Sequence, residues 1–289
     1  MVAKMTLLHS DLLSSVYHGS SLDPDFVAEA MAGQRADALI FDAPFSAKTH
    51  AGHAAAAASD TARFGRAFAA GVGKKSALTR YAKRAAASLT GGRRDLAYPS
   101  FDAHQIAAFC DLWLPLTDGW IVSITDDVLA PLWTAAFTRA GRYVFAPLPL
   151  IEIGGRVRLS GDGPSSWACW IVVARPRGLP YSRWGTLPGA YVQPAEKKRV
   201  VGGKPFQSMC GIIRDYSRRG DLVVDPFSGG GTTLAAAKQQ GRRSIGIDAS
   251  LLHAKQSAQR VARMREQINL FEPSPAPDAE QLGLFGGAA

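Results

Sequence analysis

The residues with the clearest chemical potential form a glycine-rich turn between two acidic residues. Residues 222–224 predict a buried strand that ends at Asp225, and Gly229-Gly230-Gly231 then leads toward the helix-forming residues 234–238. Such a turn leaves backbone N–H groups unpaired at the start of the helix, where they can bind a nucleotide-sized ligand. A second predicted strand ends at Asp248, near the ~20-residue spacing at which a βαβ unit places its ribose-binding acid. The spacing therefore indicates a ligand with a ribose; the alternative is a tight turn that binds nothing.

The turn fits neither of two common phosphate-binding motifs. A dinucleotide fingerprint needs a third glycine three positions after the second, and Leu234 stands at that position. A P-loop needs Gly-Lys followed by Ser or Thr, whereas Lys238 follows Ala237. A pyrophosphate or triphosphate ligand is therefore disfavoured.

Two segments resemble motifs of the amino-methylating DNA methyltransferases. Asp225-Pro226-Phe227-Ser228-Gly229-Gly230-Gly231-Thr232-Thr233 is similar to their motif I, which holds S-adenosylmethionine. Asp42-Ala43-Pro44-Phe45 follows a predicted strand at residues 38–41 and is similar to motif IV, Asp/Asn/Ser-Pro-Pro-Tyr/Phe. The resemblance implies that S-adenosylmethionine is the cofactor, held by a set of residues around the turn: Asp225, Phe227, Ser228, Gly229, Gly231, Thr232 and Asp248.

Motif IV holds the target amino group in this family, and the chemistry accounts for its residue types. An exocyclic amine is a poor nucleophile because its lone pair is delocalised into the ring. The Asp42 carboxylate and the Ala43 carbonyl can each accept one N–H, which aims the lone pair at the methyl group. Phe45 can stack on a base rotated out of the duplex. The catalytic residues implied are thus Asp42, Ala43, Pro44 and Phe45.

Two positions of motif IV depart from the family pattern. Ala43 replaces the first proline, and Phe45 stands where tyrosine is common. Ala43 retains its carbonyl and is held extended by the following Pro44, and Phe45 retains its ring face. Methyl transfer is therefore still expected.

The order of the motifs predicts the fold. Motif IV precedes motif I, the circular permutation of the β group, whose members methylate adenine N6 or cytosine N4. The resemblance implies a doubly wound, mostly parallel Rossmann-like α/β sheet, circularly permuted, with a basic helical insertion. We expect a methyltransferase domain at residues 1–271, with the insertion at about 54–97 and a short recognition or lid stretch at about 175–203. Residues 272–289, rich in Pro, Ala and Gly, are expected to be a flexible tail.

Three further residues are assigned to the cofactor by the resemblance. Asp11, at the end of an N-terminal strand, is expected on the adenine side. Lys204-Pro205 resembles motif X and opens a predicted helix through Ile213 that would pack on the methionine end.

Several other segments have the periodicity of regular structure. Asp126 and Asp127 end one predicted strand and could border the site, although a helix cap is the simpler role. The predicted strands are residues 5–9, 119–127, 143–145 and 167–174, and the predicted helices are 26–31, 106–114, 132–139 and 251–268.

Composition indicates a cytoplasmic protein, associated with the nucleoid, that binds a polyanion. No apolar run reaches the ~18 residues of a membrane span, and the N-terminus lacks a secretory signal. Cys110, Cys169 and Cys210 show no Cys-x-x-Cys spacing, which indicates reduced thiols and no metal site. The net charge of +9 and a pI near 9.7 favour a polyanionic partner, and the resemblance implies that this partner is double-stranded DNA.

The positive charge is concentrated in the insertion, which contains no acid from residue 61 to residue 94. One-sign charge with interleaved aromatic residues suits an arm that contacts phosphates; the alternatives are a solvated helical face or a partly disordered insertion. The predicted DNA-binding residues are His50, His53, Arg63, Arg66, Lys74, Lys75, Arg80, Lys83, Arg84 and Arg183.

The tail suggests one more partner. Gln281-Leu282-Gly283-Leu284-Phe285 resembles the peptide that docks on the bacterial sliding clamp, although a chance match is the simpler explanation. A homodimer is a further hypothesis.

Asp42 decides the expected target base. Adenine enzymes favour Asp at the first position of motif IV and cytosine-N4 enzymes favour Ser, so we predict methylation of adenine N6 in DNA by base flipping and direct transfer. Cytosine-N4 methylation is the runner-up. A non-catalytic DNA-binding protein, or methylation of RNA or a small molecule, are the alternatives from other classes.

Overall fold

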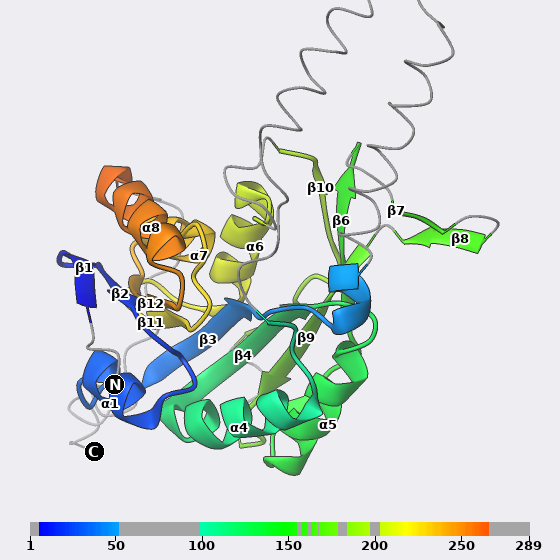
Figure 1. Ribbon diagram of the computed structural model, residues 1–289, viewed down its shortest axis with the longest axis horizontal. Coiled ribbons are helices and arrows are strands. Elements are labelled where there is room, and N and C mark those ends of the chain that lie inside the picture. The colour runs from blue at the N-terminus through cyan, green and yellow to red at the C-terminus, as the bar shows by residue number, and fades with distance from the viewer. Residues whose placement is uncertain are drawn as a thin grey trace, which may run out of the picture.

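This computed structural model is built around a central ten-stranded sheet (Figure 1). The structure describes residues 6–51, 99–154, 158–160, 163–166, 168–178, 184–196 and 203–265. The strand order is β1-β2-β12-β11-β3-β4-β9-β6-β10, with β5 paired to β9. The strands are β1 (Thr6–Ser10), β2 (Ser14–His18), β3 (Ala36–Asp42), β4 (Thr117–Thr125), β5 (Tyr143–Val144), β6 (Leu148–Ile153), β9 (Ala168–Arg175), β10 (Tyr191–Pro194), β11 (Leu222–Asp225) and β12 (Arg243–Asp248). A separate hairpin pairs β7 (Arg158–Ser160) with β8 (Gly163–Ser166).

Five adjacent strands, β2, β12, β11, β3 and β4, run parallel, so their carboxyl ends share one edge of the sheet. β9 then runs antiparallel to both β4 and β6. β3 lies beside β11 although most of the chain separates them in sequence. The mostly parallel, circularly permuted α/β sheet expected from the sequence is therefore confirmed.

The sequence analysis missed β2. Its residues, Ser14-Ser15-Val16-Tyr17-His18, are too polar to predict a buried strand, yet β2 pairs with β12 and is partly buried. Its polar groups are satisfied inside the sheet: the hydroxyls of Ser14 and Ser244 lie 2.9 Å apart.

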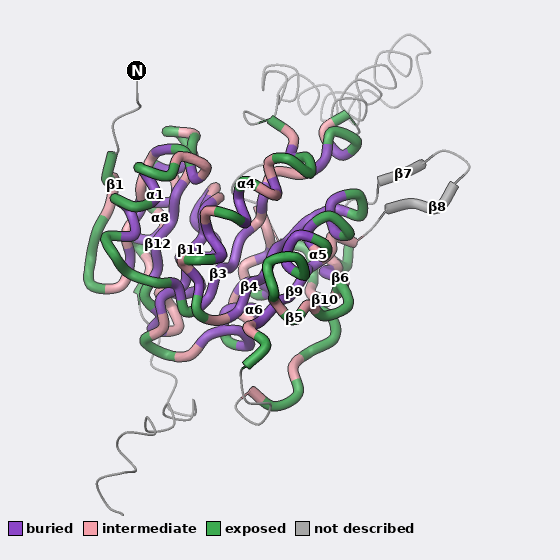
Figure 2. Tube along the Cα trace, turned by 90° about the horizontal axis from the view of Figure 1, so that it is seen from below, coloured by how far each residue is buried: buried purple, intermediate pink, exposed green. Residues whose placement is uncertain are grey.

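Helices cover both faces of the sheet (Figures 1 and 2). Leu39 and Phe41 of β3 pack with α1 (Pro24–Met31), α4 (Ala103–Trp113) and α5 (Ala130–Arg139). Ala38 and Ile40 point to the other face, which is covered by α6 (Phe206–Tyr216) and α7 (Thr232–Gln239). α8 (Leu251–Arg263) packs beside α7 over β2, and a short 3-10 turn, η1 (Leu114–Leu116), follows α4. α8 ends at Arg263, five residues before the predicted end.

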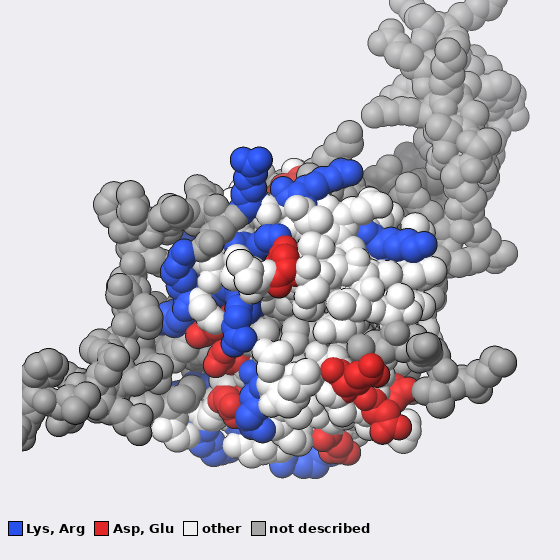
Figure 3. Space-filling view, turned by 90° about the vertical axis from the view of Figure 1, so that its left-hand side faces the viewer, with Lys and Arg blue, Asp and Glu red and all other residues white. Residues whose placement is uncertain are grey.

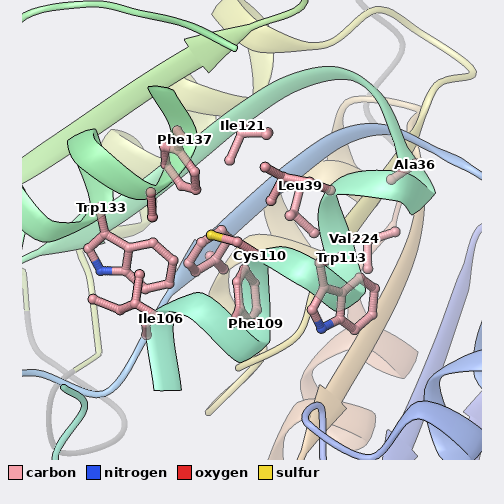
Figure 4. Packing of buried hydrophobic residues seen from close by; sticks show 14 of the residues in the cluster. Ala36, Leu39, Ile106, Phe109, Cys110, Trp113, Ile121, Trp133, Phe137 and Val224 are labelled. Atoms are coloured by element: carbon pink, nitrogen blue, oxygen red, sulfur yellow. The ribbon is translucent and has the colours of Figure 1, made fainter. Parts of the chain in front are cut away.

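Aromatic rings join the core to the glycine turn. Phe109 lies between Trp113 and Trp133, with ring centroids at 6.2 and 5.4 Å (Figure 4). Phe227, two residues after β11, stacks on Phe109 at 5.5 Å and lies 6.0 Å from Phe41. The start of the turn is therefore anchored in the hydrophobic core.

Backbone hydrogen bonds hold the rest of the turn. Ser228 N–H donates to the Ile247 carbonyl at 2.8 Å, and Gly231 N–H donates to the Ser228 carbonyl at 2.7 Å. Gly231 has φ of 72°, and a Cβ there would lie 2.5 Å from the Ser257 hydroxyl oxygen of α8. The last glycine is thus required both by the turn and by the close approach of α8.

Several predictions fall outside the described residues. They include the insertion at 54–97 and the tail at 272–289 with the clamp-like peptide at Gln281–Phe285. Among the residues that are described, no helix has both the length and the apolar character to cross a membrane.

Replacing Gly231 tests the packing of the turn against α8. Gly231→Ala and the control Gly33→Ala both place alanine at positive φ, at about 1–2 kcal/mol each. Only Gly231→Ala also meets a neighbouring helix, because Gly33 has nothing within 4 Å. We expect Gly231→Ala to lower the free energy of unfolding by about 1–3 kcal/mol more than Gly33→Ala in urea denaturation. Equal losses would contradict the close approach of α8.

Candidate active site

Three carboxylates meet at the carboxyl edge of the parallel strands. Asp42 ends β3, Asp225 ends β11 and Asp248 ends β12, and these strands are neighbours in the order β12-β11-β3. Burial, together with repulsion from Asp42 and Asp248, raises the pKa of Asp225 to about 7. The carboxyl ends of β3 and β11, which come from opposite halves of the chain, are therefore close enough for their carboxylates to interact electrostatically.

Asp225 lies beneath the turn rather than facing a ligand. The residue is 2% exposed. Its carboxylate accepts the Phe227 N–H at 3.0 Å and a hydrogen bond from the Thr233 hydroxyl. Asp225 therefore holds the turn in shape, and its predicted contact with the cofactor stays a prediction.

Asp248 is the acid that the structure places at the turn. Its carboxylate accepts the N–H of Gly229 and that of Ser250, both at 2.8 Å, and the side chain remains 13% exposed. Burial raises the pKa of Asp248, while the backbone hydrogen bonds and the nearby His253 and His18 oppose that rise.

The turn has room for a ligand at Gly229. Its φ is 49°, and a Cβ there would meet only the Phe227 carbonyl, at 3.8 Å. Thr232, at the start of α7, accepts a hydrogen bond at 2.7 Å from Arg260 of α8, a residue that the sequence analysis missed because α8 read only as basic and amphipathic. Ser228 is buried, and its hydroxyl has no hydrogen-bond partner among the described residues.

Asp11 lies away from the glycine turn, unlike its expected place on the adenine side of the cofactor. Ser14 pairs with Ser244 near the start of β12, and the carboxyl end of β2 is His18, which pairs with Asp248. Asp11 precedes β2, at the opposite edge from the glycine turn. It accepts a hydrogen bond from Lys238 in the last turn of α7. This difference follows from the unpredicted strand, because the carboxyl end of β2 lies beside Asp248.

Lys204 contacts the tetrapeptide at Asp42–Phe45. Its ammonium group forms an ion pair with the Asp42 carboxylate and lies 4.8 Å from the centroid of the Phe45 ring. Pro205 is the N-cap of α6, and the first helical N–H groups, of Phe206 and Gln207, donate to the Glu196 carboxylate at 2.8 and 3.0 Å. Glu196 was also missed, since nothing in its local sequence marks it as a cap.

The loop after motif IV is tied to β4 by Asp126. The buried Asp126 carboxylate accepts the Ser46 N–H at 2.9 Å, the Ser46 hydroxyl at 2.5 Å and the Thr49 hydroxyl at 2.6 Å. It also accepts the Leu129 N–H at 3.0 Å, just before α5. Burial raises the pKa of Asp126, but these hydrogen bonds outweigh it and the pKa is lowered. Asp126 therefore both caps a turn and fixes the loop, whereas Asp127 pairs with the exposed Lys48.

His50 is the one predicted DNA-binding residue in the described part of the chain. It is partly buried in the helical residues 47–51, and burial lowers its pKa. The rest lie outside the described residues: His53, Arg63, Arg66, Lys74, Lys75, Arg80, Lys83, Arg84 and Arg183. Figure 3 views the molecule from the side on which α8 lies in Figure 1, and Lys and Arg side chains are spread over this face.

The sequence matches a family model described as DNA methylase (N6_N4_Mtase) over residues 133–260. It is 49% identical over 59 residues to the Type II methyltransferase M.EcaI of Enterobacter cloacae, covering 20% of this chain and 13% of that protein. It is 41% identical over 63 residues to the Type II methyltransferase M2.DpnII of Streptococcus pneumoniae, covering 22% and 24%. The matched segments thus span less than a third of either relative.

Solved structures show the same fold. The M1.HpyAVI–SAM complex has a TM-score of 0.56 at 16% identity, covering 86% of this chain and 99% of that one. The cytosine-N4-specific PvuII DNA methyltransferase has a TM-score of 0.52 at 14% identity, covering 90% and 88%. The chain thus matches the DNA methylase model over residues 133–260 and shares the fold of solved DNA methyltransferases.

Proposed function

We propose that this protein methylates the exocyclic N6 of adenine in double-stranded DNA, with S-adenosylmethionine as cofactor. The observation that carries the proposal is that Asp42 lies at the same sheet edge as the glycine turn that follows β11. Asp42 ends the strand next to β11, and its charge acts on Asp225 at the end of that strand. A group bound at the turn and a group bound at Asp42 would therefore be neighbours.

The residues of the turn suit an adenosine cofactor. The space at Gly229 admits a ligand close to the backbone, and Asp248 is positioned by the Gly229 N–H with further acceptor capacity for ribose hydroxyls. Phe227, Ser228, Gly231 and Thr232 support this arrangement through packing and hydrogen bonds. When bound, S-adenosylmethionine supplies an electrophilic methyl group.

The residues of motif IV suit an amine. The Asp42 carboxylate, 27% exposed, can accept one N–H of the target amine, and the Ala43 carbonyl the other. Holding both N–H bonds points the nitrogen lone pair in one direction and reduces its delocalisation into the ring. Phe45, partly exposed beside Asp42, offers a ring face to a base rotated out of the helix. Pro44 limits the backbone of Ala43 to extended conformations.

The choice of adenine over cytosine rests on Asp42 at the head of motif IV, and cytosine N4 is the alternative. The protein is incubated with methyl-labelled cofactor and unmethylated duplex DNA, and the DNA is digested to nucleosides. Label in N6-methyladenine is the expected result. Label in N4-methylcytosine would assign the alternative, and unlabelled DNA would contradict methyl transfer altogether.

Asp42→Asn and Asp42→Ala should lower methyl transfer at least about 100-fold, because the amine loses the group that orients it. Both changes also remove the Asp42 charge from beside the Lys204 ammonium, which is 8% exposed. Removing one partner of a buried pair costs about 3–5 kcal/mol, so stability is measured alongside activity. Asp118→Asn is the control: Asp118 forms an exposed ion pair with Arg35 near the start of β4. It should change stability by about 1 kcal/mol or less and leave transfer unchanged. Full activity in Asp42→Asn would contradict the proposed role.

Asp248→Ala should weaken binding of S-adenosylmethionine about 10–100-fold in calorimetry, since a hydrogen bond to a charged group is worth about 1.5–3 kcal/mol. Asp11→Ala is the matched control: it removes an acid at the opposite edge of the sheet and should leave binding unchanged. If Asp11→Ala weakened binding as much, the assignment of Asp11 to the cofactor would be supported.

A further inference from the structure

The contact between Lys204 and Asp42 assigns a role to a residue that the motif pattern had linked to the cofactor. We propose that Lys204 is a positioning residue for methyl transfer: its ammonium group holds the Asp42 carboxylate ionised and fixes its rotation, so that the carboxylate accepts an N–H of the target amine. This inference rests on the proposed function.

Burial makes the ion pair more than a surface contact. The Lys204 side chain is 8% exposed and the Asp42 side chain 27%. A buried ammonium group loses its hydration and is stable only beside an opposite charge, whereas an exposed pair contributes little. Lys204 also lies over the ring of Phe45, so one cation touches two residues of motif IV.

The chain around Lys204 is fixed from both sides. Glu196, just after β10, accepts the N–H groups of Phe206 and Gln207, which fastens the start of α6 directly after Lys204-Pro205. Arg260 of α8 lies 5.3 Å over the ring of Phe206 and also donates to Thr232 at the glycine turn. The segment that carries Lys204 is therefore fixed by contacts with Glu196 on one side and, through Arg260, with Thr232 of the glycine turn on the other.

The charges that face Asp42 explain why a cation is needed. Asp225 of β11 acts on Asp42 directly, and Asp248 of β12 lies on the other side of Asp225. Two neighbouring carboxylates favour proton uptake, and among the described residues Lys204 contributes a cation that opposes it. On the motif IV loop itself, Lys48 is paired with Asp127 and exposed. A protonated Asp42 would lose part of its capacity to accept an N–H from the amine.

The test compares Lys204→Met, Lys204→Gln and Lys204→Arg with the wild type. Methyl transfer to duplex DNA is measured from about pH 5 to pH 9, where the rate reports the ionisation of essential groups. Lys204→Met should lower kcat about 100-fold and move the acid limb of the profile up by about one pH unit or more. Lys204→Gln, which keeps an N–H donor without charge, should show the same shift with a smaller loss. Lys204→Arg, which keeps the charge, should retain the wild-type limb and most of the rate.

Calorimetry with S-adenosylmethionine separates this role from cofactor binding, and its affinity should stay the same in all three variants. Arg35→Met, which breaks an exposed pair near the amino ends of β3 and β4, is the control and should behave as wild type. An acid limb that does not move in Lys204→Gln, or a loss confined to cofactor affinity, would overturn the inference while leaving the proposed function intact. A wild-type protein that methylates no DNA would remove both. Should Lys204→Met fail to fold, the Gln and Arg pair still decides the outcome, since they differ in charge.

Discussion

The site depends on how the chain accommodates three carboxylates at one edge of a parallel sheet. Each carboxylate is accommodated differently. Asp225 is buried beneath the turn, and burial raises its pKa to about 7. Asp248 is stabilised by two backbone N–H groups, and Asp42 by an ammonium group. Asp225 therefore shapes the turn, whereas the Asp42 and Asp248 side chains remain 27% and 13% exposed.

Support for these acids comes from residues distant in sequence. The aromatic cluster of Phe41, Phe109 and Phe227 ties the ends of β3 and β11 to the same core. On the other face, Arg260 of α8 connects the start of α7 with the start of α6. Because both faces are fixed, the separation between motif IV and the glycine turn is set by packing rather than by the loops.

The sequence predicted those parts of the site whose chemistry is local. The turn from Asp225 to Gly231 and the tetrapeptide at Asp42 each combine a strand end with unusual backbone requirements, and both lie where expected. β2 could not be predicted because its polar residues are satisfied by partners in β12, which only the fold supplies. The unexpected place of Asp11 follows directly from that omission.

Long-range partners were also hidden from the sequence. Lys204 lies beside a proline and a helix start, which suggested a cofactor contact, but its charge is directed to Asp42 across the sheet edge. Asp126 read as a helix cap, and its second function depends on Ser46 and Thr49 from another segment. Such roles depend on which side chains meet in space, and periodicity carries no information about that.

The alanine in motif IV is explained by the same long-range contacts. Ala43 is 3% exposed and belongs to the aromatic core cluster, so a small apolar side chain fits its position. A proline there would restrict the backbone by its ring. In this chain the backbone is restricted on both sides of Ala43 instead: β3 ends just before it, and beyond Pro44 the Ser46 N–H is bound by Asp126. The orientation of the Ala43 carbonyl therefore does not require the proline.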